Sequence, residues 1–138
     1  MTEELDNKLC EKYPKIFRDR HAPMISTAMC WGFEHDDGWF QIIDELCNKL
    51  QKHTDENPEK HPQVVACQVK EKFGGLRFYV NGADDYQHDL IDDAERESYE
   101  TCEKCGSKEN IGQTKGWITT LCKKCAEGNE HWEENKKK

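Results

Sequence analysis

The spacing of apolar residues predicts two helices in the first half of the chain. Thr2 can cap a first helix that carries Leu5, Leu9 and Tyr13 on one face and ends at Pro14. Residues 15–30 then show little periodicity and predict a connection with a short turn at Ile16 and Phe17. Asp36 or Asp37 can cap a second helix, which ends at the polar run 51–61, a loop flanked by Pro58 and Pro62. Its apolar positions are Trp39, Ile42, Ile43, Leu46, Cys47 and Leu50.

Two β-branched and aromatic segments, residues 64–70 and 76–80, predict an antiparallel hairpin. Without a bulge, one face of the hairpin is apolar and the other is polar, and Lys70 lies opposite Arg77. The expected apolar face consists of Val65, Cys67, Val69, Leu76, Phe78 and Val80, and the polar face of Gln68, Lys70, Arg77 and Tyr79.

A third, acidic helix is predicted after the hairpin, capped by Asp84 or Asp85 and running to about Tyr99. Its apolar stripe is narrow and consists of Tyr86, Leu90, Ile91 and Ala94. Residues 84–103 contain nine acidic side chains and one basic one, a balance of −8 that equals the net charge of the whole chain.

The last third of the chain contains Cys102-x-x-Cys105 and Cys122-x-x-Cys125, separated by 16 residues. This spacing is typical of a four-thiolate zinc site, and four protein ligands leave no open position for catalysis. Gly106 suits a knuckle turn, residues 117–121 suit a short strand, and a helix from about Cys122 would carry Trp132. That order predicts a treble-clef or zinc-ribbon-like module that ends in a frayed tail at residues 136–138.

Composition favours a small α+β protein in which a metal supplements a thin core. Apolar and charged residues each make up 35% of the 138 residues. We expect a helical and β-hairpin domain at residues 1–100 and a zinc module at 101–138. The net charge of −8 argues against a general coat for nucleic acid or anionic membranes. With no apolar leader or membrane-spanning run, the sequence predicts a soluble, cytoplasmic protein.

The hairpin supplies a candidate ligand site. Like charges at Lys70 and Arg77 favour an anion between them, with Lys72 as a third cation. Tyr79 or Trp31 could stack on a nucleotide, and Trp39 could form a pocket wall. Alternatively, the anion is the acidic third helix of the protein itself.

Two other clusters have structural as well as functional interpretations. The stretch 31–39, with Glu34, His35, Asp36 and Asp37, could form a hydrolytic or second metal site, or a capped turn between core tryptophans. The lysines around the knuckles could offset the charge of the zinc thiolates or contact nucleic acid: Lys104, Lys108, Lys115, Lys123 and Lys124. His131 has no partner histidine, which argues against a treble-clef nuclease. The remaining cysteines, Cys10, Cys30, Cys47 and Cys67, are expected to be half-buried thiols, with a second metal site or a reactive thiol as the alternative.

Several of these motifs together resemble a family of small phage and prophage proteins without a settled function. They are Trp31-Gly-Phe-Glu34, Asp37-Gly-Trp39, the run Lys70-Glu-Lys-Phe-Gly-Gly-Leu-Arg-Phe-Tyr79 and the knuckles with Trp117-Ile-Thr-Thr-Leu-Cys122. The resemblance spans residues 29–125. In that family the last metal position is often a histidine, whereas this chain has Cys125.

The resemblance implies a protein that acts in the cytoplasm of an infected host, on host defence or regulation. Together with the residues, it favours a non-enzymatic protein that binds a host protein or sequesters an anionic nucleotide, with homo-oligomerisation left open. The alternative is a zinc-finger regulator that contacts nucleic acid. An enzyme is least favoured, because the sequence offers no clear combination of nucleophile, general base and orienting group.

Overall fold

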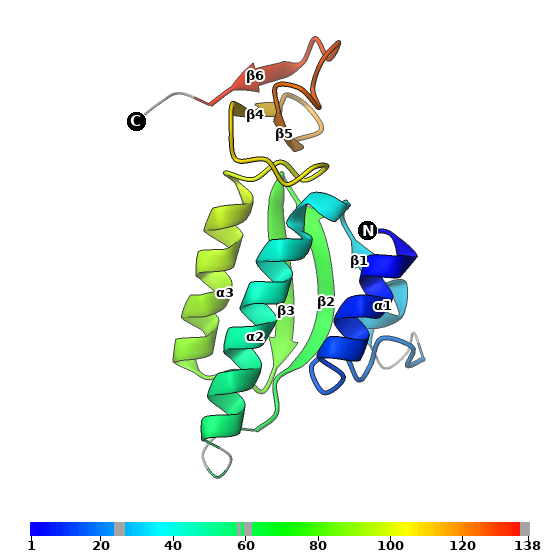
Figure 1. Ribbon diagram of the computed structural model, residues 1–138, viewed down its shortest axis with the longest axis vertical. Helices are drawn as coiled ribbons and strands as arrows, with labels where there is room; N and C mark the ends of the chain where they lie inside the picture. Colours follow the sequence, from blue (N-terminus) through cyan, green and yellow to red (C-terminus); the bar gives the residue numbers. More distant parts are fainter. Residues whose placement is uncertain (24–26, 58, 60–61, 136–138) are drawn as a thin grey trace.

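The computed structural model describes residues 1–23, 27–57, 59 and 62–135, and in these ranges the chain folds as an α+β protein. The helices are α1 (Glu3–Lys12), α2 (Phe40–Glu56) and α3 (Asp85–Ser98), with short 3₁₀ turns η1 (Ala28–Trp31) and η2 (Asp37–Trp39). One sheet contains β1 (Phe33–Glu34), β2 (Val65–Lys72) and β3 (Gly75–Asn81), and the other contains β4 (Ile111–Thr114), β5 (Thr120–Cys122) and β6 (Trp132–Glu134). Helices α2 and α3 cover one face of the first sheet, and the second sheet lies beyond the hairpin tip (Figure 1). None of the described helices combines the length and apolar character needed to cross a membrane.

The first sheet has the order β1-β2-β3, in which β1 is parallel to β2 and β2 is antiparallel to β3. Lys70 lies opposite Arg77, as the sequence predicts. The apolar face given for a hairpin without a bulge does not hold along the whole of β2, because the register shifts between Ala66 and Gln68. A bulge reverses which side chains face the core. Ala66 therefore joins the core cluster, and Cys67 is only half-buried.

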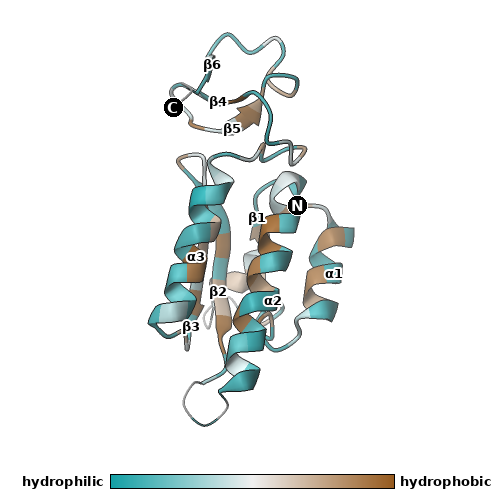
Figure 2. Cartoon of the chain, turned by 60° about the vertical axis from the view of Figure 1, so that its left-hand side comes forward, coloured by the Kyte–Doolittle hydropathy of each residue, from teal (hydrophilic) through white to brown (hydrophobic). Residues whose placement is uncertain are grey.

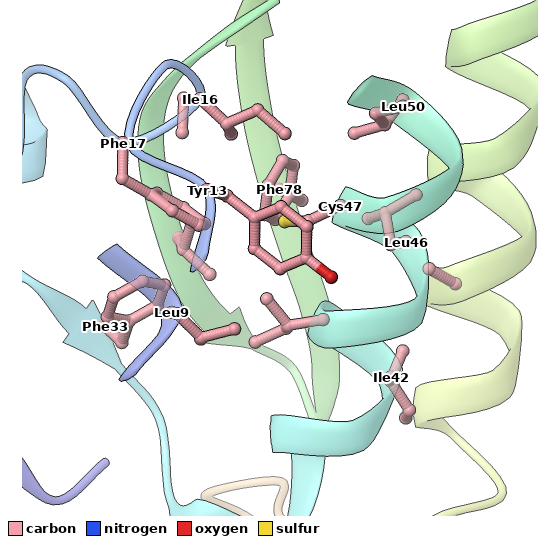
Figure 3. Packing of buried hydrophobic residues seen from close by; sticks show 14 of the residues in the cluster. Leu9, Tyr13, Ile16, Phe17, Phe33, Ile42, Leu46, Cys47, Leu50 and Phe78 are labelled. Carbon is pink, nitrogen blue, oxygen red and sulfur yellow. The ribbon is translucent and has the colours of Figure 1, made fainter. Parts of the chain in front are cut away.

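The main core lies between α1, α2 and the first sheet (Figure 3). Leu9, Ile43 and Leu50 are fully buried. Ile16 and Phe17 lie in a turn and are also buried, and the carbonyl of Ile16 accepts a 2.8 Å hydrogen bond from the Ala66 N–H. Helix α3 is predominantly hydrophilic (Figure 2), and it contributes only Ala94 to the fully buried part of this core.

The helix boundaries confirm two predicted caps, Thr2 for α1 and Asp84 for α3, and correct a third. Asp84 forms a capping box with Gln87 at the start of α3. Neither Asp36 nor Asp37 caps α2; Asp37 instead accepts a 2.7 Å hydrogen bond from the N–H of Thr2 at the start of α1. Helix α2 also continues six residues past Leu50, since buried Thr54 accepts a hydrogen bond from Gln87. Of the loop predicted at 51–61, residues 58, 60 and 61 lie outside the described residues.

The C-terminal sheet has the order β5-β4-β6, and both pairings are antiparallel. The helix expected from Cys122 was wrong: turns follow this residue, and Trp132 belongs to β6. Gly128 has a φ of +84°, which interrupts a helix, and the indole N–H of Trp132 donates a 3.0 Å hydrogen bond to the carbonyl of Leu121. A treble clef is thus not confirmed. The predicted strand lies slightly later, at Thr120–Cys122, and the tail 136–138 is outside the described residues.

Candidate functional site

The four cysteines of the two C-x-x-C motifs form one cluster. Their sulfur atoms all lie within 4.8 Å of one another, and the Sγ atoms of Cys105 and Cys122 are 3.7 Å apart. Cys102 and Cys122 are buried, Cys125 is half-buried and Cys105 is exposed. None of them forms a disulfide. The arrangement is that of a single metal site with four sulfur ligands.

Local hydrogen bonds shape both knuckles. The N–H of Gly106 donates to the carbonyl of Cys102 at 2.9 Å, and the N–H of Ala126 donates to that of Cys122 at 3.0 Å. Gly106 has a φ of +82°, as expected for a residue that closes a knuckle turn. Each C-x-x-C segment is therefore folded so that its two sulfurs converge.

The thiols influence one another's protonation. Burial raises the pKa of Cys122, but the N–H of Cys125 and hydrogen bonds to the other thiols lower it to about 7. The pKa of Cys125 is raised to about 12, mainly by burial and to a lesser extent by hydrogen bonds to the other three thiols. Four thiolates this close repel one another, so a divalent cation at the centre would favour their joint ionisation.

The first knuckle packs tightly against the start of α2. The N–H of Gly38 donates a 2.6 Å hydrogen bond to the carbonyl of Glu103, and the indole N–H of Trp39 donates to that of Thr101 at 3.1 Å. A Cβ at position 38 would lie 2.1 Å from the carbonyl oxygen of Cys102. Only glycine allows this approach.

The hairpin tip forms the second contact with the C-terminal part. Gly74 accepts a 2.6 Å hydrogen bond from the hydroxyl of Thr120 in β5. A Cβ on Gly75 would lie 2.3 Å from the ring of Tyr99, just after α3. The Gly-Gly pair thus serves close packing of the protein on itself. We call the contacts of Gly38, Trp39, Gly74 and Gly75 with residues 99–120 the joint.

Glu103 is a buried carboxyl within the joint and is 4% exposed. Its Oε2 atom accepts a 3.1 Å hydrogen bond from the N–H of Asp36. Burial, opposed by that hydrogen bond and reinforced by the charges of Asp36 and Glu71, raises its pKa to about 7. Nearby His35 is also buried, and burial lowers its pKa to about 4.

The acidic stretch around His35 contains β1 and the 3₁₀ turn η2. In the described part of the chain, the four-cysteine cluster is the only group of three or more side chains placed to hold a metal. The Nδ1–H of His35 donates a 2.7 Å hydrogen bond to the carbonyl of Asp36. Among the other cysteines, Cys47 is buried and Cys10, Cys30 and Cys67 are half-buried, as expected for core thiols.

The polar face of the hairpin, which we call the outward face, carries Gln68, Lys70, Lys72, Arg77 and Tyr79. Arg77 forms a 2.6 Å ion pair with Glu95 of α3, and Tyr99 also hydrogen-bonds it. The anion beside Arg77 is therefore a carboxylate of the acidic helix. This agrees with the alternative in which the protein itself supplies the anion. Tyr79 is 44% exposed, and in the described residues no carboxylate forms an ion pair with Lys70 or Lys72.

The two tryptophans predicted to border a ligand have different environments. Trp39 is fully buried, so it is a core residue that a surface ligand cannot reach. Trp31 is 62% exposed at the end of η1. Of the knuckle lysines, Lys108 pairs with Glu97 and Lys115 with Glu133.

Sequence reasoning missed two exposed aromatic residues. Phe73 is 65% exposed in the turn between β2 and β3, and Trp117 is 81% exposed between β4 and β5. A two-residue turn was legible in Phe73-Gly74, because Gly at the second position favours a tight hairpin. Nothing local indicated that Ile118, the residue after Trp117, packs against Gly74, the residue after Phe73.

Comparisons with models of known protein families, with curated proteins and with solved structures find no match for this chain. The resemblance to phage and prophage proteins therefore stays a prediction, and the geometry of the site carries the functional argument.

Proposed function

We propose that this chain is a non-enzymatic binding protein in which one structural zinc ion fixes the β2–β3 hairpin and presents its outward face to an anionic ligand. The observation that carries the proposal is the four-cysteine cluster, whose module is attached to the hairpin by the hydrogen bonds and close contacts of the joint. All four ligands come from the protein, so the metal would have a closed coordination shell and a structural role.

Zinc is the metal that the ligand set favours. Zn–S bonds of about 2.3 Å in a regular tetrahedron place the sulfurs about 3.8 Å apart. The Cys105–Cys122 separation of 3.7 Å is close to this value. Four thiolates also select zinc or iron over the hard cations magnesium and calcium.

Metal analysis of the purified protein tests the zinc assignment. We expect about one zinc per chain, and we expect Cys102→Ser to lose the metal and to unfold at least residues 101–135. Cys30→Ser is the matched control, because Cys30 is half-buried and lies outside the cluster. Full structure after complete zinc removal would refute a structural metal.

The ligand surface is proposed to centre on Lys70, Lys72 and Tyr79. Two ammonium groups without an ion-pair partner among the described residues suit phosphate, and an exposed phenol suits stacking on a base. Arg77 holds the hairpin on α3 and is excluded from the ligand contacts. The resemblance to phage proteins supports a role in the cytoplasm of an infected host, through a nucleotide or a host protein.

Calorimetric titration with a panel of cyclic and linear nucleotides tests the nucleotide version. Heat from at least one nucleotide, reduced in Lys70→Gln and Lys72→Gln but unchanged in Lys49→Gln on α2, would support it. No heat from any nucleotide would remove this version.

A further inference from the structure

The hairpin tip brings one end of the outward face next to the C-terminal sheet. Gly74 lies against the β4–β5 segment: a Cβ on this glycine would be 2.9 Å from the Cγ2 of Ile118. Phe73 directly precedes Gly74, and Trp117 directly precedes Ile118. The segments that carry these two exposed aromatic residues, from separate parts of the chain, therefore meet at the joint.

Phe73 has an unusual backbone conformation for its size. Its φ is 53°, in the left-handed region that glycine and asparagine favour. Such a position carries a conformational cost for a bulky residue, and a side chain that is 65% exposed gains little from burial in return. A ligand that covers the ring would supply the missing contact.

The charge distribution favours an anionic ligand at this end of the molecule. Residues 1–100 contain 22 acidic and 12 basic side chains, whereas residues 101–135, the described part of the C-terminal region, are close to neutral with six and five. Lys70 and Lys72 add two cations on the adjoining strand, and the Nζ atom of Lys72 lies 5.7 Å from the centre of the Phe73 ring. The tip thus combines exposed aromatic rings with local positive charge in an acidic protein.

We propose that this surface binds single-stranded nucleic acid, with bases stacked on Tyr79, Phe73 and Trp117 and phosphates held by Lys70 and Lys72. Stacking on exposed aromatic side chains next to lysines is the usual mode of sequence-tolerant single-strand binding. The inference rests on the proposed function and deepens it by naming the class of ligand.

Two features distinguish this ligand from a mononucleotide or a duplex. From the level of Tyr79 to Phe73 the strand spans about 16 Å, at roughly 3.3 Å per residue, which exceeds the reach of one nucleotide. A duplex keeps its bases stacked on one another, so their faces are closed to aromatic side chains. The surface therefore requires an unpaired strand of several nucleotides.

Fluorescence anisotropy with labelled dT12 and U12 tests the inference on zinc-loaded protein at low salt. We expect both strands to bind, with thymidine monophosphate and a 12-base-pair duplex at least tenfold weaker. Two phosphate contacts predict a log–log salt slope of about −1.4. Preference between dT12 and U12 would show whether DNA or RNA is the better ligand.

Variants connect binding to the proposed residues. Phe73→Asn suits the left-handed turn and removes the ring, and we expect it and Trp117→Ala each to weaken binding fivefold or more. Tyr86→Ala is the control, because Tyr86 is 55% exposed on α3, outside this surface. Lys72→Glu should weaken binding more than Lys49→Glu, which makes the same change in charge.

The results that would overturn the inference are separate from those that would overturn the proposed function. Equal affinity for the mononucleotide or the duplex, or unchanged binding in both aromatic variants, would refute a single-strand site and leave the zinc role intact. Absence of binding to dT12 and U12 at low salt by protein with one zinc per chain would also refute it.

Discussion

Replacing Gly38 with alanine should destabilise the protein through the joint alone. The new Cβ would lie 2.1 Å from the carbonyl oxygen of Cys102 and 2.4 Å from that of Glu103. Non-bonded carbon and oxygen atoms rarely approach within 3.0 Å, so the knuckle must move away by about 1 Å. That shift would stretch the 2.6 Å hydrogen bond from Gly38 to Glu103 beyond bonding distance.

The expected cost combines steric strain with the lost hydrogen bond. Overpacking of this kind costs about 1–3 kcal/mol, and a buried backbone hydrogen bond contributes about 1 kcal/mol. A total of about 2–4 kcal/mol corresponds to a urea midpoint lowered by about 1–2 M at a slope of about 2 kcal/mol/M.

Urea unfolding of zinc-loaded protein, followed by circular dichroism, measures this loss. Gly116→Ala is the control, because Gly116 has a φ of +80° and no atom within 4 Å of a Cβ there, so it reports conformational strain alone, about 1 kcal/mol. A Gly38→Ala midpoint equal to that of the wild type would refute the close packing of the joint.

Three further substitutions test other contacts. His35 has a pKa of about 4 when folded and about 6.5 when unfolded, so its own contribution should lower stability by about 3 kcal/mol as pH falls from 6.5 to 4, whereas Glu103, with its pKa raised to about 7, changes stability in the opposite direction. The difference in stability between the wild type and His35→Gln, measured by unfolding at each pH, should therefore change by about 3 kcal/mol over this range; a constant difference would contradict the assignment. Phe73→Asn should raise the urea midpoint by the equivalent of about 0.5–1 kcal/mol, because asparagine tolerates a φ of 53°, and a lowered midpoint would count against backbone strain. Arg77→Met should cost about 1–2 kcal/mol through its bonds to α3, compared with less than about 0.5 kcal/mol for Lys72→Met, and equal midpoints would argue against a structural arginine.

The elements that local pattern controls were predictable. The capping box of Asp84, the face of α2 and the Cys-x-x-Cys pairs each depend on residues a few positions apart. The extension of α2 to Glu56 was missed, because Thr54 is buried against Gln87, which is 33 residues away. Periodicity within one helix carries no information about such a partner.

The hairpin shows the same limit in its register. The opposition of Lys70 and Arg77 followed from the tight turn at Phe73-Gly74, which fixes the pairing of nearby residues. The bulge at Ala66–Gln68 lies farther from the turn and changes the core face there. A bulge requires no characteristic residue type at this place. The alternation of apolar and polar residues is therefore compatible with a strand that has a bulge and with one that has none.

The joint was the least predictable feature, and it changes the meaning of the Gly-Gly turn. From sequence, two glycines beside basic residues suggest a backbone that approaches a phosphate. In the structure, Gly74 and Gly75 are buried against β5 and Tyr99, so their lack of side chains serves contact between the two parts of the chain.

Different residues of the motif Lys70–Tyr79 therefore have different roles. In Lys70–Tyr79, the glycines and Arg77 attach the hairpin to the four-cysteine module and to α3, whereas Lys70, Lys72, Phe73 and Tyr79 remain directed outward or exposed. The residues that fix the hairpin are different from those proposed to meet the ligand. A rigid tip lowers the entropic cost of ordering its side chains when a ligand binds. A metal that holds the tip in place can therefore increase the affinity for the proposed ligand without touching it.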